Sequence, residues 1–285
     1  MKVLIFGCGF IGFPVARRLI EAGNRVFAVT RSAEKAARLQ QIGVAPIQAN
    51  WMDRRSLVGL PSVDAALIAV GYDRSCGLSQ REVYVEGLRN ALGSISPAAK
   101  LIYCSSTGVY HQSDGCWVDE TSPTHPEREG GRAHLAAEQL LWRLRPEQPT
   151  VILRLAGLYG PQRVPRIVEL KAGNPLPVAA DSWLNLIHQV DVVSGIIAAW
   201  HHPQPDRLYV VSDGKPVKRA DYYRTAATLW DAPEPLFEAP TPGSHRSERS
   251  QGEKRIWPAR FRRDLVPQLS YPSYREGLRH SMRKH

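Results

Sequence analysis

The chain has 285 residues, enough for one large hydrophobic core or for a core with a smaller lobe. Its apolar fraction of 43% is typical of a globular protein, and no apolar run is long enough to span a membrane. Cys8, Cys76, Cys104 and Cys116 are scattered, so we expect neither a disulfide framework nor a metal site. The short apolar stretch near the start lacks a cleavage site of small residues, which favours a cytoplasmic protein.

The net charge of +10 is concentrated towards the C-terminus. Residues 245–285 contain eleven Lys or Arg and four Asp or Glu, a net of +7, whereas the other residues together carry only +3. Either a lobe that holds an anionic small molecule or a solvated basic tail explains this excess. No nucleic-acid-binding motif accompanies it, so a nucleic-acid partner is the least favoured interpretation.

The first predicted elements are a strand, a glycine-rich turn and a helix. The stretch "KVLIFGCGFIG" gives a buried strand over Lys2–Phe6 and then a GxGxxG pattern, and the second strand follows at "RVFAVTR". In such a pattern, the first glycine permits a tight turn, the second lets the backbone approach a pyrophosphate, and the third lets the helix pack on the strand. The free N–H groups of the helix then face the phosphates. The turn residues expected to bind a dinucleotide are Gly7, Gly9, Phe10, Ile11 and Gly12.

The end of the second strand indicates which dinucleotide is bound. An NAD site would place Asp or Glu there to accept from the ribose 2′-hydroxyl. This chain has Thr30, Arg31 and Ser32 instead, with Lys35 one turn later. Because a guanidinium and a hydroxyl can bond a 2′-phosphate, we predict NADP in preference to NAD, read mainly by Arg31.

Alternating strands and helices continue through the N-terminal half. Further strands are predicted in "APIQANWMDRRSL", "VDAALIAVG", "AKLIYCSSTGVY" and "PTVILRLAGLYGP", with helices near Ser32–Ile42, Arg81–Ile95 and Arg132–Leu144. This order predicts an α/β fold, a doubly wound parallel sheet. We place the core at residues 1–157, rejoined at about 185–230. This leaves about 158–184 and 231–285 for a smaller C-terminal lobe, whose role in binding substrate is what the family resemblance described below implies.

The predicted lobe is rich in proline and basic residues. Four of them lie in segments that could meet an anionic substrate: Arg163, Arg166, Lys254 and Arg255. A long polar loop lies between Asp231 and Lys254, of a length that is either mobile or closes over a ligand. The stretch "YPSYREGL" offers two aromatic anchors that would close the lobe.

Several motifs together resemble a known family. "GCGFIG", "CSSTGVYHQSDGCWVDETSP", "ILRLAGLYGP" and "WLNLIHQVDVV" resemble the extended short-chain dehydrogenases/reductases, the NAD-dependent epimerase/dehydratase group, and the tail looks like an atypical subgroup. The resemblance implies a Rossmann domain with NAD(P) and a small lobe over the substrate. In many members that substrate is a nucleotide sugar, and members are often dimers.

Carried over by position, the resemblance assigns roles to residues after successive strands. Ser106 would bond the reacting substrate oxygen, and His188 and Asp191 would join core and lobe structurally. The adenine side would be lined by Asn50 and Trp51, and the cofactor ribose would lie over Ala69, Val70 and Gly71.

The family's catalytic pair is missing from the sequence. Spacing from Ser106 places the family's tyrosine on Gly130 and its lysine on His134. Three residues could replace the pair in proton transfer: His134, which could titrate near pH 6–7, and Tyr84 and Tyr72. An ordinary surface position for His134 and a packing role for each tyrosine are the favoured explanations.

Three functions stay open on these grounds. The favoured one is an NADP-dependent oxidoreductase that reduces a small, anionic or sugar-nucleotide-like carbonyl substrate, because hydride transfer to a polarised carbonyl needs only a modest acid. The others are a non-catalytic NADP(H) sensor or regulatory protein, and a nucleotide-sugar epimerase/dehydratase. The sequence names neither the substrate, the direction, the replacement for the tyrosine–lysine pair, nor the oligomeric state.

Overall fold

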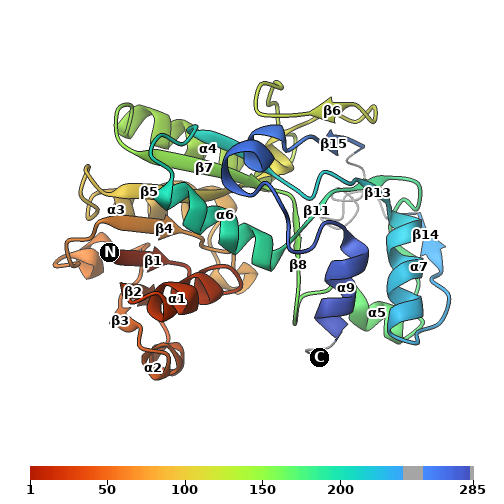
Figure 1. The fold of residues 1–285 in the computed structure, drawn as a ribbon, viewed down its shortest axis with the longest axis horizontal. Coiled ribbons are helices and arrows are strands. Elements are labelled where there is room, and N and C mark those ends of the chain that lie inside the picture. Colours follow the sequence, from red (N-terminus) through yellow and green to blue (C-terminus); the bar gives the residue numbers. More distant parts are fainter. Residues whose placement is uncertain (240–252, 283–285) are drawn as a thin grey trace. The chain divides into compact units, whose positions relative to one another are not determined.

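The computed structural model describes residues 1–239 and 253–282, and its largest feature is a seven-stranded sheet (Figure 1). The strand order is β12-β7-β5-β4-β1-β2-β3. The strands are β1 (Lys2–Phe6), β2 (Arg25–Thr30), β3 (Ala45–Gln48), β4 (Ala65–Ile68), β5 (Lys100–Ser106), β7 (Thr150–Leu155) and β12 (Leu208–Val211). The predicted Rossmann-type α/β fold is confirmed. β1 lies between β2 and β4, so the direction in which successive strands are added to the sheet reverses at β1.

The strands of this sheet are parallel. β1 pairs in parallel with both β2 and β4, placing Ile5 opposite Ala28 and Leu67. At the other edge, β7 lies beside β12. Ile152 N–H donates to the Arg207 carbonyl, and Ala156 N–H donates to the Val211 carbonyl. Donor and acceptor both advance by four residues from the first bond to the second, as they do in a parallel pair. Strands covered on both faces read as continuous apolar runs, which is why the sequence revealed them.

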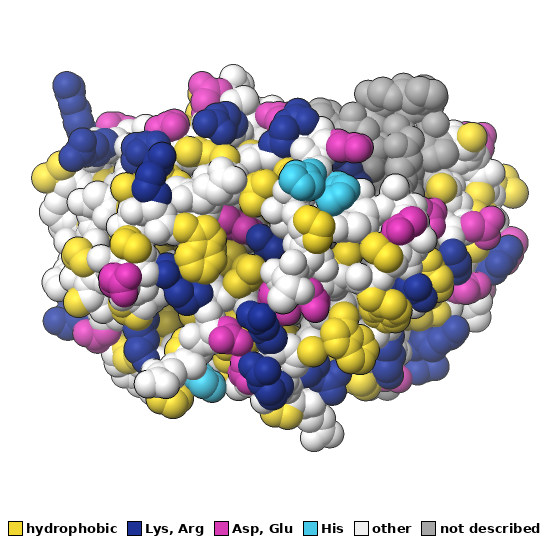
Figure 2. Space-filling view, turned by 90° about the horizontal axis from the view of Figure 1, so that it is seen from above, with side chains coloured by type: hydrophobic (Ala, Val, Ile, Leu, Met, Phe, Trp, Pro, Cys, Tyr) yellow, Lys and Arg dark blue, Asp and Glu magenta, His cyan; other side chains and the backbone are white. Residues whose placement is uncertain are grey.

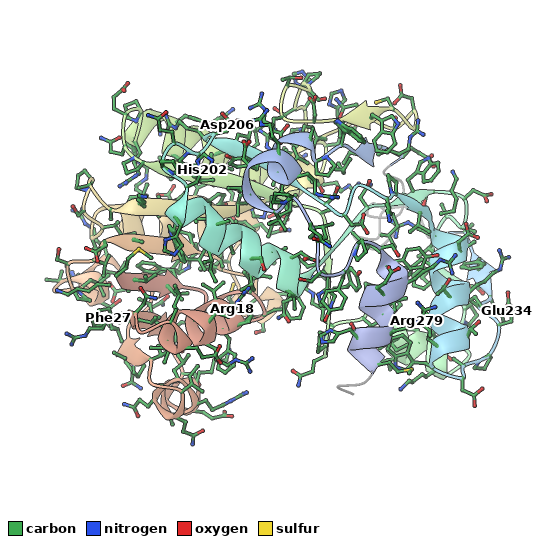
Figure 3. All side chains as sticks on the ribbon, viewed as in Figure 1. Arg18, Phe27, His202, Asp206, Glu234 and Arg279 are labelled. Atoms are coloured by element: carbon green, nitrogen blue, oxygen red, sulfur yellow. The ribbon has the colours of Figure 1, made fainter. Side chains whose placement is uncertain are left out.

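Helices cover both faces of this sheet. They are α1 (Gly12–Glu21), α2 (Ala33–Gln41), α3 (Gly87–Leu92), α4 (Glu129–Leu144) and α6 (Gln189–His201), with a π-helical turn, η3 (Glu82–Glu86), leading into α3. α1 and α6 lie side by side on one face, where Arg18 Nη1 donates to Ser194 Oγ at 2.9 Å (Figures 1 and 3). α3 and α4 pack on the other face, against alternate strand residues such as Phe6, Ile68 and Tyr103.

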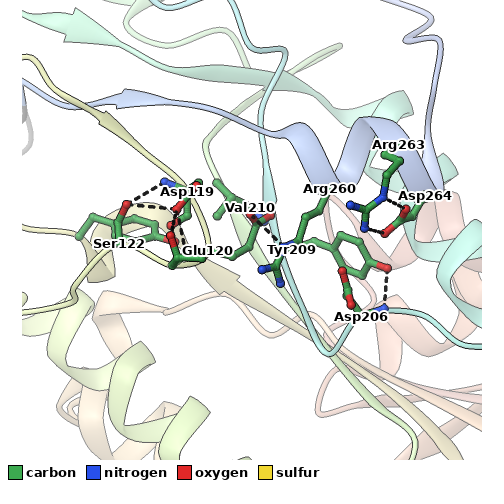
Figure 4. Close-up of polar contacts among 11 residues, drawn as sticks. Asp119, Glu120, Ser122, Asp206, Tyr209, Val210, Arg260, Arg263 and Asp264 are labelled. Carbon is green, nitrogen blue, oxygen red and sulfur yellow. Dashed lines mark hydrogen bonds and ion pairs between the residues drawn. The ribbon is translucent and has the colours of Figure 1, made fainter.

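The chain divides into two compact units. The first comprises residues 1–109, 129–154 and 193–209, and the second 110–128, 155–192 and 210–285. Residues 110–128, 155–157, 185–192 and 210–230, which the sequence placed in the core, belong to the second unit. The reason is local packing: Glu120 accepts from Val210 N–H at 2.8 Å and lies 3.7 Å from the Arg260 guanidinium, which ties these segments to each other (Figure 4).

The second unit has short strands around an aromatic core. Its elements are β6 (Trp117–Val118), β8 (Gly157–Tyr159), α5 (Ile167–Lys171), β9 (Leu176–Pro177), β10 (Trp183–Leu184), β11 (Leu186–His188), β13 (Val217–Lys218), α7 (Arg219–Leu229), β14 (Phe237–Glu238), β15 (Arg255–Ile256), η5 (Phe261–Leu265) and α9 (Tyr274–Met282). Tyr159, Tyr222, Tyr223 and Tyr274 are buried together in this core. Part of the predicted long polar loop, residues 240–252, lies outside the described residues.

His188, the last residue of β11, and Asp191, in the first turn of α6, are both buried. Asp191 is fully buried and accepts from the backbone N–H groups of Ser270 and Tyr271, at 2.7 and 3.2 Å. The His188 ring lies 3.9 Å from that of Tyr271 between centroids. In the described parts of the chain, no helix has both the length and the apolar character needed to cross a membrane.

Candidate functional site

The glycine-rich turn after β1 has the geometry that each of its glycines was expected to provide. Gly7 has φ +87°, and a Cβ there would lie 2.4 Å from the Ala69 carbonyl oxygen. A Cβ on Gly12 would lie 2.4 Å from the Gly7 carbonyl oxygen, so only glycine lets α1 pack this closely. A Cβ on Gly9 would meet nothing within 4 Å, which leaves its backbone approachable by a ligand.

Two of the segments expected to bind the cofactor, the glycine-rich turn and Ala69–Gly71, lie next to each other. Ala69 follows β4, and its N–H donates to the Phe6 carbonyl at 2.8 Å, so the segment Ala69–Gly71 lies directly beside Gly7. Ile11 precedes α1 and offers no side-chain cap for the first N–H groups of that helix. A turn with close-packed glycines and an uncapped helix start fits a dinucleotide pyrophosphate.

The end of β2 has a feature that the sequence did not reveal. Ser32 caps α2 by accepting from Lys35 N–H at 3.2 Å, and Arg31 forms an exposed ion pair with Asp73, 3.6 Å away. Asp73 is held by the N–H and hydroxyl of Ser75, which lower its pKa first, with a smaller contribution from the Arg31 charge. The fold thus brings a carboxylate to Arg31 from a distant segment, and a 2′-phosphate would have to compete with it.

Of the two residues expected beside the adenine, Trp51 belongs to the core. Its side chain is 8% exposed, and a Cβ on Gly87 would lie 2.5 Å from the indole. Asn90 Nδ2 donates to the Trp51 carbonyl at 3.0 Å. Asn50 uses Oδ1 to accept from Met52 N–H at 3.1 Å. The Trp51 indole is therefore held in the core packing, and the assignment of Asn50 and Trp51 to the adenine side stays a prediction.

Ser106 ends β5, beside the first turn of α4. Its Oγ accepts from Gly108 N–H at 3.0 Å. A Cβ on Gly108 would lie 3.2 Å from Ser106 Oγ and 3.9 Å from Gly131 Cα, so the serine hydroxyl and the glycine pair of α4 are neighbours.

A buried ion pair fixes α4 against the sheet. Glu138 and Arg154 are joined at 2.7 Å with side chains 1% and 7% exposed, and Ser105 Oγ donates to Glu138 at 2.5 Å. Because Ser105 adjoins Ser106, this network ties the middle of α4 to the end of β5, where the candidate catalytic serine lies.

The volume beside Gly130 is filled by Gln80, which sequence reasoning missed. A Cβ on Gly130 would lie 2.7 Å from Gln80 Oε1. Glu129 accepts from the backbone N–H of Gln80 at 2.9 Å and from its Nε2 at 3.3 Å. The signal that could have found this pair is weak: "SQRE", with Ser79 and Glu82 in a capping box that starts the helix.

His134, one helical turn beyond Gly130, is a neutral packing residue. Its Nδ1 shares a hydrogen bond with the Tyr103 hydroxyl at 3.0 Å, and its ring stacks on Tyr84 with centroids 4.2 Å apart. Burial lowers the pKa of His134 to about 4. The expectation that it titrates near pH 6–7 is therefore wrong, because the surrounding rings exclude the water that would solvate its charged form.

Neither candidate tyrosine is prepared for proton transfer. The Tyr72 hydroxyl donates to the Leu78 carbonyl at 2.6 Å, and desolvation, with the neighbouring Cys76 and Glu129, raises its pKa. Tyr84 is 8% exposed and lies in the π-helical turn against His134. Both residues pack in the hydrophobic core cluster between the sheet and α4.

The basic residues expected to meet a substrate lie in the second unit and have different surroundings. Arg255 lies between the rings of Trp117 and Trp183, with its Cζ 4.9 and 5.4 Å from their centroids, so it holds two strand pairs together. Lys254 is buried, donates to the Tyr110 carbonyl at 3.0 Å, and has its pKa lowered to about 8 by burial. Arg166 lies 3.6 Å from Glu169, and Arg163 lies in an exposed turn bridged to Gly160.

Charges of both signs are mixed on the face drawn in Figure 2, where basic and acidic side chains alternate. The structure therefore shows no continuous basic field on that face. A small anionic ligand held by a few side chains needs no such field, whereas a nucleic-acid backbone does.

Residues 3–212 match the NAD dependent epimerase/dehydratase family, and the chain belongs to that family. A solved structure from Methylobacillus flagellatus, described as an NAD-dependent epimerase/dehydratase, is 31% identical with a TM-score of 0.78, covering 97% of this chain and 95% of its own. UDP-glucose 4-epimerase from Thermotoga maritima, solved with UDP-glucose, has a TM-score of 0.80 over 100% of this chain and 98% of its own. At 18% identity it shows the shared fold alone.

Two curated relatives have different activities. The chloroplast stem-loop binding protein of 41 kDa b from Arabidopsis thaliana is 27% identical, with 91% of this chain and 70% of its own length aligned. The 2-alkyl-3-oxoalkanoate reductase of Stenotrophomonas maltophilia is 28% identical over 64% of this chain and 59% of its own length. The family thus includes proteins with different functions, and the site must decide the function of this one.

Proposed function

We propose that this protein is an NADP-dependent reductase of a small, anionic carbonyl compound. The observation that carries the proposal is the close-packed glycine turn of Gly7 and Gly12 against the end of β4, next to Ser106 on the neighbouring strand β5. Arg31, Ser32 and Lys35 at the end of β2 support NADP, since a guanidinium, a hydroxyl and an ammonium favour a 2′-phosphate. When bound, the cofactor supplies a hydride.

The lack of a strong base supports reduction in preference to alcohol oxidation. Within the described site, His134 is neutral with a pKa of about 4 and the pKa of Tyr72 is raised, so neither removes a hydroxyl proton well at neutral pH. Reduction needs only a proton delivered to the developing alkoxide, which water can provide. Ser106 would orient the carbonyl oxygen.

The substrate class rests on one relative. The reductase relative is named for an oxoalkanoate, a ketone that carries a carboxylate. We therefore infer a ketone with a carboxylate or phosphate group as the substrate.

Cofactor choice is tested by titrating NADPH and NADH against the wild type and the Arg31→Glu variant, followed by fluorescence. We expect the variant to lose NADPH affinity by about 10- to 100-fold with little change for NADH. Arg89→Glu is the matched control, because Arg89 is also exposed and ion-paired but lies on α3. Unchanged NADPH affinity in Arg31→Glu would refute the assignment.

Turnover is tested by following NADPH absorbance with a panel of 3-oxoacids, phosphorylated ketones and nucleotide sugars. A second candidate is a non-catalytic NADP(H) sensor, favoured by the Gln80 side chain at the position of the family's base. Tight NADPH binding without turnover of any panel member would favour the sensor. Interconversion of nucleotide sugars without net NADPH consumption would favour an epimerase, the activity of the Thermotoga maritima structure.

A further inference from the structure

We propose that Asp73 is a specificity-determining residue for the cofactor, because its carboxylate competes with the 2′-phosphate of NADPH for the Arg31 guanidinium. The inference rests on the proposed function, which assigns the 2′-phosphate to Arg31. It goes further by naming an opposing residue that comes from the loop after β4. An NAD site keeps its acidic residue at the end of β2 instead.

The two partners of this ion pair come from opposite sides of β1. In the parallel sheet, Phe6 lies opposite both Val29 of β2 and Ile68 of β4. The end of β2 and the loop after β4 therefore flank the glycine-rich turn that follows β1. The ion pair between Arg31 and Asp73 joins these two sides at the carboxyl ends of the strands, the edge at which doubly wound sheets bind dinucleotides.

Asp73 is held with one carboxylate oxygen towards Arg31. Its Oδ1 accepts from the N–H and hydroxyl of Ser75, at 3.0 and 2.6 Å, and so caps the short turn η2 (Arg74–Cys76). Its Oδ2 lies 3.6 Å from Arg31 Nη2. The Ser75 hydrogen bonds lower the pKa of Asp73 first, and the charges of Arg31 and Lys35 lower it further. The carboxylate is therefore charged at neutral pH.

Part of the predicted phosphate site is already used within the chain. Ser32 N–H donates to Thr30 Oγ1 at 3.2 Å, and the Ser32 hydroxyl accepts from Lys35 N–H at 3.2 Å. A 2′-phosphate therefore depends mainly on the Arg31 guanidinium. Among the residues that the structure describes, Asp73 is the carboxylate with which that guanidinium is paired.

The charges explain why Asp73 would separate the two cofactors. A 2′-phosphate carries a charge of about −1.5 to −2 at neutral pH, so it must displace the carboxylate from Arg31 and then lie near a like charge. NADH has a neutral hydroxyl at this position, which the carboxylate does not repel. Asp73 therefore weakens NADPH binding and leaves NADH binding unaffected. Because both side chains of the pair are exposed, solvent and salt screen this effect.

Asp73→Asn tests the inference, because asparagine removes the charge and keeps an oxygen that can accept from Ser75. We expect the variant to bind NADPH about 3- to 10-fold more tightly at low ionic strength, with NADH affinity unchanged, in fluorescence titrations. The gain should shrink as KCl is raised to about 0.5 M. It should also appear with adenosine 2′,5′-bisphosphate and be absent with AMP, which lacks the 2′-phosphate.

Asp53→Asn is the matched control. Asp53 is exposed and caps its own short turn, η1 (Arg54–Leu57), by accepting from Arg55 N–H at 2.9 Å, but it has no ion pair within the described chain. Its substitution should leave both cofactor affinities unchanged. In an Arg31→Ala background, Asp73→Asn should give a smaller gain in NADPH affinity than in the wild type, because the two anions no longer compete for a guanidinium.

The outcomes separate this inference from the proposed function. If Asp73→Asn leaves NADPH affinity unchanged or lowers it, or gives the same gain without the Arg31 side chain, the role of Asp73 is refuted while the reductase function stands. If Asp73→Asn tightens NADPH binding but no panel substrate is reduced, the reductase function is refuted and the role of Asp73 stands. If the wild type binds no NADPH, both are refuted.

Discussion

The contact between Gly130 and Gln80 can be measured without knowing the substrate. Replacing Gly130 by alanine adds a Cβ 2.7 Å from Gln80 Oε1, closer than a van der Waals contact allows. The amide must then move and lose its 3.3 Å hydrogen bond to Glu129, at a cost of about 1 kcal/mol. Alanine in place of glycine in a helix stabilises by about 1 kcal/mol, so the two effects nearly cancel.

Removing the Gln80 side chain should reveal the stabilising effect of Gly130→Ala on the helix. In a Gln80→Ala background, Gly130→Ala no longer displaces an amide and should stabilise the protein by about 1 kcal/mol. The coupling free energy between the two positions is therefore about 1 kcal/mol, or a shift of about 2–4 °C in the thermal midpoint. Differential scanning fluorimetry and urea unfolding of the four variants measure it.

Gly93 provides the control for this experiment. Gly93, at the end of α3, has space for a Cβ, which would lie 3.4 Å from the nearest atom, the Asn90 carbonyl oxygen. Gly93→Ala and Gln80→Ala should therefore be additive. If Gly130→Ala has the same effect with and without the Gln80 side chain, Gln80 does not fill this space.

Three further outcomes are expected. Burial raises the pKa of Asp213 from 3.8 to about 7, so the free energy of unfolding should decrease by about 4 kcal/mol as pH rises from 4 to 7, and Asp213→Asn should flatten this slope in urea titrations. Glu138→Gln should lower stability by about 3–5 kcal/mol, because it removes the carboxylate charge that faces the buried Arg154 guanidinium; equal stability by calorimetry would contradict a stabilising role for this ion pair. Gly7→Ala should lower the thermal midpoint of the apo-protein. Gly9→Ala should leave that midpoint unchanged and weaken NADPH binding. A lower thermal midpoint in Gly9→Ala as well would show that Gly9 is also packed.

The fold was largely predictable because its signals are local. Apolar runs such as Lys2–Phe6 and Arg25–Thr30 coincide with β1 and β2, and the helix expected near Ser32–Ile42 is α2 with Ser32 as its cap. α4 begins at Glu129, three residues before the predicted start at Arg132. Glycine is a poor helix former, so the pair at its first turn obscured that boundary.

Contacts between distant segments could not be predicted. Asp73 lies 42 positions after Arg31 in the sequence, and Gln80 is separated from Glu129 by 49. Nothing in either local pattern specifies these pairs, because they form only when the loop after β4 is placed against β2 and α4. The low pKa of His134 likewise depends on burial by side chains from other elements.

By itself, the sequence determined the strand–turn–helix pattern of the cofactor half, since the turn after β1 needs a positive φ at Gly7 and has no room for a Cβ on Gly12, which would meet the Gly7 carbonyl oxygen. It also determined that no tyrosine or lysine stands at positions 130 and 134. Only the tertiary structure decided what replaces them. Gln80 fills the space beside Gly130 because the helix that it begins packs against α4, and side-chain packing across elements is not encoded in any short stretch of the chain.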